Sequence, residues 1–156
     1  MGEALQVVRE FYSLPAVGDE PQAIKLLDPE IEWTEAERTP YFNGTLRGVT
    51  ALVTAVATRL FEPMQRDFKE FRTVPGEFIT EGDRVVAFGN YFGLTKRFDR
   101  TMSAPFVHCW TVSDGRLRQL IHIRAPRLGM RLWRHTIMFD SPGRKAVSAD
   151  FHENGR

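Results

Sequence analysis

The stretch of sequence that decides the fold runs from Ser103 to Arg124 and reads SAPFVHCWTVSDGRLRQLIHIR. Its two halves alternate apolar residues with other residues, and Ser113-Asp114-Gly115 interrupts the alternation. An Asp-Gly pair between two alternating runs is a strong short-range signal for a β-hairpin. The sequence therefore predicts two antiparallel strands that are joined at Asp114-Gly115.

The register of this hairpin has two alternatives. A two-residue loop places His108 opposite Ile121, whereas a three-residue loop with Gly115 in the left-handed conformation and a bulge places His108 opposite Leu120. We favour the second, which also places Phe106 opposite His122. One face then carries Phe106, His108, Trp110, Leu120 and His122, and the other carries Val107, Cys109, Ile121 and Ile123. Because both sets are too apolar for open water, we expect one face to line a cavity and the other to pack on a partner.

Length and composition exclude several classes of protein. The 156 residues suit one domain, and 42% hydrophobic with 26% charged residues is typical of a globular protein. A net charge of +1 argues against a nucleic-acid partner. No apolar run approaches the roughly 18 residues that span a bilayer, and the acidic N-terminus lacks the features of a signal peptide. The single cysteine, Cys109, excludes an intrachain disulfide and fits a reducing compartment, so we expect a cytoplasmic location and no membrane contact.

Apolar periodicity predicts the other elements. Helices are expected over residues 3–14, 21–27 and 49–61, the last ending before Pro63, and strands over 31–35, 68–80 and 84–94, with a loop over 39–48. Glycines within the strand patterns, at Gly76, Gly89 and Gly93, predict bulges or bends and hence a strongly curved sheet. The expected fold class is α+β, with a strongly curved mixed or antiparallel sheet wrapped around N-terminal helices as a cone with an internal pocket.

Two segments are expected in the chain. Residues 1–125 form the cone-shaped domain with its pocket. Residues 126–156 form a C-terminal extension that is partly mobile and basic, and the sequence does not reveal its role.

Five motifs occur in an order typical of one superfamily. They are VVREFYSLPAVGD (7–19), LLDPEIEW (26–33), RG before the third helix (47–48), EGDRVVAFGNY (81–91) and APFVHCWTVSDGRL (104–117). With these motifs the chain resembles the nuclear transport factor 2-like superfamily, in its branch of SnoaL-like polyketide cyclases and ketosteroid isomerase-like proteins. The resemblance implies a curved-sheet cone with a deep pocket, commonly dimeric through the sheets. It does not imply one function, because members include isomerases, cyclases, hydrolases and proteins that only bind.

The chain departs from the steroid isomerases at the positions that carry their chemistry. Those enzymes use a helix tyrosine and a hairpin acid to stabilise an enolate, and a strand aspartate to move the proton. The matching positions here are Phe11, His108 and Trp33. The resemblance therefore disfavours a steroid isomerase. Epoxide hydrolysis is also disfavoured, because the required Asp-Arg-Asp cluster cannot be assembled from this sequence.

His108 and Glu35 are the candidate catalytic pair. Alternation in their strands points both side chains inward, and a histidine beside a carboxylate in an apolar cavity suits general acid–base chemistry. The alternative is that His108 is a core histidine bonded to a helix or to Tyr12. The candidate ligand-binding residues are Tyr12, Trp33, Tyr41, Tyr91, Phe106, Trp110 and His122.

No metal or cofactor is expected. His108 and His122 with Glu35 as a third ligand make only a weak metal site. Cys109 faces away from His108 and lacks an activating base, so it is interpreted as a small buried apolar residue.

These observations predict a protein that binds a small apolar or aromatic molecule. The favoured function is a cofactor-free, cyclase- or isomerase-like enzyme acting by proton transfer next to a carbonyl. The alternative is a non-catalytic ligand-binding or dimerisation module of the same fold, and the sequence leaves open whether the chain is an enzyme. In either case we expect a homodimer through the outer sheet face.

Overall fold

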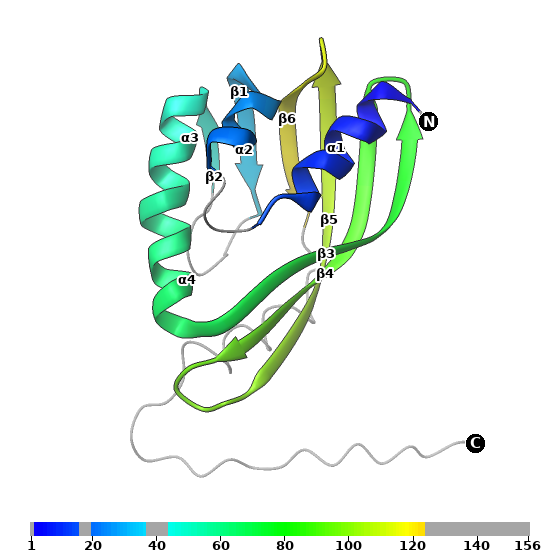
Figure 1. The fold of residues 1–156 in the computed structure, drawn as a ribbon. Helices are drawn as coiled ribbons and strands as arrows, with labels where there is room; N and C mark the ends of the chain where they lie inside the picture. Colours follow the sequence, from blue (N-terminus) through cyan, green and yellow to red (C-terminus); the bar gives the residue numbers. More distant parts are fainter. Residues whose placement is uncertain (1, 16–19, 37–43, 124–156) are drawn as a thin grey trace, which may run out of the picture.

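A computed structural model describes residues 2–15, 20–36 and 44–123 of the chain (Figure 1). The helical segments are α1 (Glu3–Ser13), α2 (Glu20–Leu26), α3 (Val49–Val56), the π-helical η1 (Ala57–Phe61) and α4 (Glu62–Asp67). The strands are β1 (Leu27–Glu35), β2 (Gly44–Arg47), β3 (Phe68–Glu81), β4 (Arg84–Thr95), β5 (Thr101–Ser113) and β6 (Arg116–Ile123). The α+β class is confirmed, but β2 lies within the predicted loop. The extension 126–156 falls outside the described residues.

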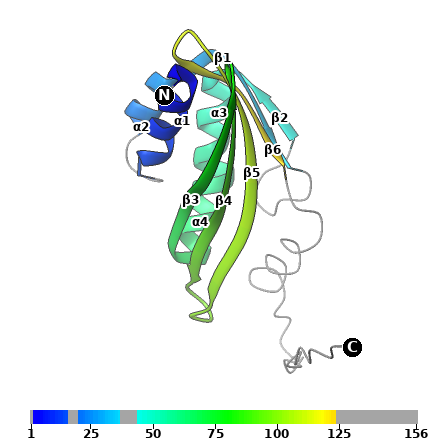
Figure 2. The same cartoon turned by 90° about the vertical axis from the view of Figure 1, so that its right-hand side faces the viewer.

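The six strands form one sheet in the order β2-β1-β6-β5-β4-β3. Strands β3 to β6 follow one another as an antiparallel meander, and β1 joins this meander by parallel pairing with β6. The sheet is therefore mixed, curved and unclosed. α1, α2 and α3 lie on its concave side (Figure 2), which fits the cone expected from the sequence.

α1 supplies the apolar layer on the concave side. Its buried residues, Ala4, Val7 and Val8, recur at helical spacing and join one core cluster with residues of β1, β5 and β6. None of the described helices has the length and apolar run needed to cross a membrane.

The third predicted helix does not end before Pro63. Helical structure continues from α3 through η1 into α4 and stops only at Asp67. Pro63 lies in the first turn of α4, where its missing N–H is tolerated best, and the wider π-helical turn of η1 precedes it.

The β5–β6 hairpin has neither of the two predicted registers. Asp114 and Gly115 both have positive φ, 51° and 69°, which indicates a two-residue type I′ loop. The register then shifts by one residue between Thr111 and Val112, and this shift brings His108 opposite His122. The bulge thus lies inside the hairpin and not in the turn. The predicted grouping of residues on each face is nonetheless correct, since Phe106, His108, Trp110, Leu120 and His122 are all buried.

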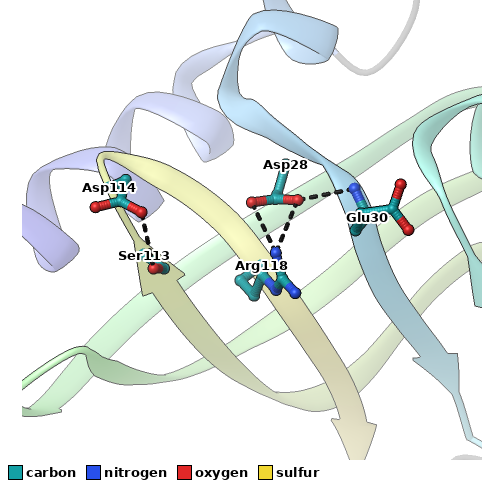
Figure 3. Close-up of polar contacts among 5 residues, drawn as sticks. All are labelled: Asp28, Glu30, Ser113, Asp114 and Arg118. Carbon is teal, nitrogen blue, oxygen red and sulfur yellow. Dashed lines mark hydrogen bonds and ion pairs between the residues drawn. The ribbon is translucent and has the colours of Figure 1, made fainter.

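The residue skipped by this register shift is Arg118, and it ties β6 to β1 (Figure 3). Its Nη1 lies 3.2 Å from both carboxylate oxygens of Asp28. The backbone N–H of Glu30 also donates to Asp28, and this bond together with the Arg118 guanidinium lowers the pKa of the Asp28 carboxyl. The bulge therefore sets the hairpin register, and its skipped residue Arg118 also contacts β1.

The absence of a side chain at Gly89 in β4 leaves room for a neighbouring aromatic ring. A Cβ at this position would lie 2.4 Å from the carbonyl oxygen of Val74 and 2.5 Å from the ring of Phe106. Both neighbours are held in place, one in the backbone of β3 and the other by its burial. We expect Gly89→Ala to lower the free energy of unfolding by about 1–3 kcal/mol, as overpacking of a core does. Urea denaturation measures this change.

Gly76→Ala is the matched control. Gly76 lies at a predicted bulge, where the β3–β4 register shifts between Pro75 and Glu77. Its added Cβ would lie 3.7 Å from the nearest heavy atom, which is an ordinary contact. Equal destabilisation by both substitutions would contradict the steric explanation.

Candidate functional site

Two histidines lie side by side in the apolar interior of the concave face. His108 on β5 and His122 on β6 are 7% and 9% exposed. They are register partners, and their rings meet edge to face with centroids 4.8 Å apart. Buried imidazoles need polar partners, because an unpaired polar group in an apolar core is costly. Each histidine has a different set of partners.

His108 is held between two tyrosines. Its Nδ1 lies 2.7 Å from the hydroxyl of Tyr12 on α1, and its Nε2 lies 2.8 Å from the hydroxyl of Tyr91 on β4. The Tyr12 hydroxyl also accepts a hydrogen bond of 3.0 Å from Nε1 of Trp110. Three elements thus converge on one imidazole ring.

These partners favour one placement of the protons. An indole N–H can only donate, so Tyr12 accepts from Trp110, and its own proton is then available for donation to Nδ1 of His108. Nε2 of His108 then carries the proton of the neutral ring and donates it to Tyr91. Each of these hydrogen bonds has one donor and one acceptor when His108 is neutral.

Burial and neighbouring charge support the neutral form. Burial, and then the proximity of His122, lower the pKa of His108 well below its ordinary value. Burial likewise raises the pKa of Tyr12, although the N–H of Trp110 offsets part of this effect. Burial and then the charge of Glu35 raise the pKa of Tyr91 well above its ordinary value. Both phenols therefore stay protonated at neutral pH.

The lowered pKa of His108 predicts that stability falls in acid. Below pH ~6.5 the unfolded chain binds a proton at His108 that the folded chain does not bind. The contribution of neutral His108 to the free energy of unfolding is complete above that pH. Below it, this contribution decreases by at most about 1.4 kcal/mol per pH unit. Urea denaturation at several pH values should show this slope in the wild type and a shallower one in His108→Gln. Identical slopes would contradict a neutral buried His108.

His122 is paired with Glu35 instead of a tyrosine. Its Nδ1 lies 2.6 Å from Oε2 of Glu35, and the carboxylate's other oxygen, Oε1, accepts a 2.8 Å hydrogen bond from Nε1 of Trp33. The carboxylate is therefore anchored on both oxygens. Trp33, Glu35 and His122 form a linear hydrogen-bonded unit across β1 and β6.

The expected contact between His108 and Glu35 is not formed. β6 lies between β1 and β5 in the sheet, and the last β1–β6 pair is Thr34 with Ile121. Glu35 therefore meets the next residue of β6, His122, while both nitrogens of His108 bond to tyrosines. The alternative interpretation, in which His108 bonds to Tyr12, describes its first contact correctly.

Aromatic rings surround both histidines. Phe106 stacks on His108 at 4.2 Å between centroids and on Tyr91 at 4.8 Å, while Trp33 and Trp110 meet edge to face at 5.6 Å. The structure thus brings together all predicted ligand-binding residues except Tyr41, which lies outside the described residues.

Two further rings were missing from the predicted site. Phe11 lies 5.1 Å from Trp110, and Phe71 stacks on Tyr91 at 5.6 Å between centroids. The helical spacing of Phe11 and the strand alternation of Phe71 were available as signals, but only the fold shows which rings they meet.

A separate groove of about 710 Å3 opens where α3 meets β1 and β2. Its lining includes Pro29, Glu30, Arg47, Thr50 and Arg59, and it contains none of the predicted site residues. The groove and the histidine pair are therefore two distinct regions of the molecule.

Neither a metal centre nor a thiol nucleophile is built into the described part of the chain. Residues 2–15, 20–36 and 44–123 contain no group of three or more His, Cys, Asp or Glu side chains that could hold a metal ion. Cys109 pairs with Ile121 on the other face of the sheet, and burial raises the pKa of its thiol.

Comparison with solved structures identifies many similar folds. An NTF2-like protein of unknown function from Burkholderia pseudomallei is 27% identical with a TM-score of 0.69, over 85% of this chain and 98% of that one. TerC, co-crystallized with polyporic acid, is 25% identical with a TM-score of 0.64, over 85% of this chain and 99% of that one.

A third similar structure shows the fold alone. It is a putative SnoaL-like polyketide cyclase from Jannaschia sp., 14% identical with a TM-score of 0.62, over 78% of this chain and 84% of that one. No curated protein matches the chain in sequence. Residues 8–120 match the family model described as SnoaL-like domain. The chain therefore belongs to the SnoaL-like family, within the NTF2-like superfamily.

Proposed function

We propose that this protein binds a small aromatic molecule on the concave face of its sheet and transfers a proton next to a carbonyl of that molecule. The observation that carries the proposal is the pair of buried histidines, His108 and His122, with Glu35 bonded to His122. Ionisable groups held in an apolar setting with specific partners are typical of acid–base sites. The reaction class is that of a cofactor-free isomerase or cyclase.

The surrounding rings support an aromatic ligand. Trp33, Tyr91, Phe106 and Trp110 surround a few polar groups with apolar rings, which is the usual composition of a small-molecule site. Among the similar structures, TerC was co-crystallized with polyporic acid, an aromatic hydroxyquinone, and others are named polyketide cyclases. An aromatic carbonyl compound is therefore the ligand class to test first.

Proton exchange on a model ketone tests this function. 2-Tetralone is a bicyclic ketone fused to an aromatic ring, and its C1 protons lie next to both the ring and the carbonyl. In D2O the wild-type protein should accelerate the replacement of these protons by deuterium above the buffer rate, as followed by NMR. Exchange at the buffer rate, with 2-tetralone shown to be bound, would contradict the enzymatic proposal.

A non-catalytic binding module is the second candidate. Its specific support is His108, whose nitrogens are both bonded to tyrosines and whose ring is almost fully buried. Such a histidine holds the surrounding rings in place without exchanging protons with a ligand. This candidate predicts bound 2-tetralone together with unaccelerated exchange.

We also propose that the outer face of the sheet forms a homodimer. Ile79, Val86, Cys109 and Ile121 are successive register partners across four strands of that face. Exposed large residues there include Ile79 at 54%, Ile121 at 40% and Ile123 at 49%. A continuous apolar surface of this kind is unusual on a monomer.

The dimer proposal predicts a change of mass on a single substitution. Ile121→Lys would place a charge in the interface, so we expect light scattering at micromolar concentration to show a dimer for the wild type and a monomer for the variant. Ile24→Lys is the control, because Ile24 is 39% exposed but lies on α2. A monomeric wild type would contradict the proposal.

The cytoplasm remains the proposed location. The proposal is supported by the single free cysteine, Cys109, which suits a reducing compartment.

A further inference from the structure

We infer that His122 is the residue that carries the proton, that Glu35 and Trp33 position it, and that His108 is a structural imidazole. This inference rests on the proposed function, and it reverses the roles that the sequence suggests for the two histidines. The argument depends on which nitrogen of each ring holds a proton and which nitrogen is left to react.

The proton on Nδ1 of His122 follows from its partners. The indole N–H of Trp33 occupies Oε1 of Glu35, and an ionised carboxylate can only accept hydrogen bonds. Nδ1 of His122, 2.6 Å from Oε2, must therefore be the donor. A neutral His122 then carries its lone pair on Nε2.

That lone pair has no hydrogen-bond donor among the described residues. The ring of His122 forms T-shaped pairs with His108, at 4.8 Å, and with Tyr91, at 6.0 Å between centroids. Its one hydrogen bond within the described part of the chain goes to Glu35. By contrast, both nitrogens of His108 are occupied. His122 is thus the only histidine of the pair with a nitrogen left for a ligand.

The proton transfer balances on this arrangement. Nε2 of His122 takes a proton from the carbon next to the carbonyl, so a C–H bond breaks, an N–H bond forms and the electron pair moves to the carbonyl oxygen as an enolate. Return of the proton to carbon reverses each change. Glu35 accepts the hydrogen bond from Nδ1–H throughout, so it acts as a positioning residue and not as a second acid.

Nitrogen-15 NMR of the full-length protein tests the tautomers directly. Long-range 1H–15N spectra at about pH 8 distinguish the two neutral forms of an imidazole, and His108→Gln and His122→Gln variants assign the signals. We expect Nδ1–H for His122 and Nε2–H for His108. Nε2–H for His122 in the wild type would overturn the inference.

Glu35→Gln tests the positioning role with a readout that packing alone would not change. The amide oxygen can still accept from Trp33, but its NH2 group then faces Nδ1 of His122 and donates to it. We expect His122 to switch to the Nε2–H tautomer and 2-tetralone exchange to fall on the order of 10²–10⁴-fold, since no base remains on Nε2.

Glu32→Gln is the matched control on the same strand. Glu32 bonds to Arg47 and Gln119 on the other face, so its substitution should change neither the tautomer nor the exchange rate. An unchanged His122 tautomer in Glu35→Gln would overturn the inference. If Glu35→Gln does not fold, the wild-type tautomers decide the question.

Failure of this inference is distinguishable from failure of the proposed function. The tautomers are measured without any substrate, whereas the proposed function fails if wild-type exchange stays at the buffer rate. Wild-type exchange that persists with His122 in the Nε2–H form would overturn the role of His122 and leave the proposed function intact.

Discussion

Replacing His122 by glutamine is expected to slow the exchange of 2-tetralone protons on the order of 10²–10⁴-fold, the usual contribution of a general base. The glutamine side chain can keep a hydrogen bond to Glu35, but it has no nitrogen lone pair that could take a proton from carbon. We therefore expect the rate constant to fall while affinity for the ketone changes by less than about tenfold, or ~1.4 kcal/mol.

Two controls accompany this measurement. The melting temperature and circular dichroism of His122→Gln show whether the variant is folded, and Glu32→Gln shows the effect of changing a side chain on the other face of β1. A folded His122→Gln protein that exchanges protons as fast as the wild type would exclude His122 as the base.

Tyr12→Phe is expected to give the largest loss of stability among the variants considered. The hydroxyl of Tyr12 is bonded to two buried groups, the indole N–H of Trp110 and Nδ1 of His108. Phenylalanine leaves both without this partner, and a buried unsatisfied group costs about 1–3 kcal/mol. We expect the free energy of unfolding to fall by about 2–4 kcal/mol, as measured by urea denaturation.

Ser13→Ala is the control for this variant. Ser13 is the next residue of α1, and its hydroxyl donates to the carbonyl of Glu10 in an exposed position. Its loss should therefore cost less than about 0.5 kcal/mol. A Tyr12→Phe protein as stable as Ser13→Ala would mean that the bonds of Tyr12 are replaced by water or by other groups.

The faces of the sheet could be predicted from the sequence because side-chain alternation is a local property. The pattern in β5 placed Phe106, His108 and Trp110 on the buried side, and the structure agrees. The same rule correctly turned Cys109 toward the other face. These predictions need only the period of a strand and the position of the Asp114-Gly115 turn.

The pairing of the polar residues could not be predicted, because it depends on non-local strand order. Glu35 and His122 are 87 residues apart in the chain, and they meet only because β1 lies beside β6 and pairs with it in parallel. The bulge at Arg118 then decides that His122, and not Leu120 or Ile121, lies opposite His108. Local sequence signals carry neither piece of information.

Helix continuation past Pro63 was missed for a different reason. A proline usually marks the end of a helix. Here the proline lies where the π-helical segment Ala57–Phe61 changes into α4, and the helical structure continues. The short strand β2 was missed because Gly44 and Gly48 flank only a few residues, too few for a periodic signal.

The location of a bound aromatic ligand tests the central claim most directly. A crystal structure of the protein with polyporic acid should show the compound on the concave face, between Trp33 and Tyr91, with one of its oxygens within hydrogen-bond distance of Nε2 of His122. Polyporic acid in the groove between α3 and the β1–β2 edge, with the concave face empty, would contradict the claim that the histidine cluster is the functional site.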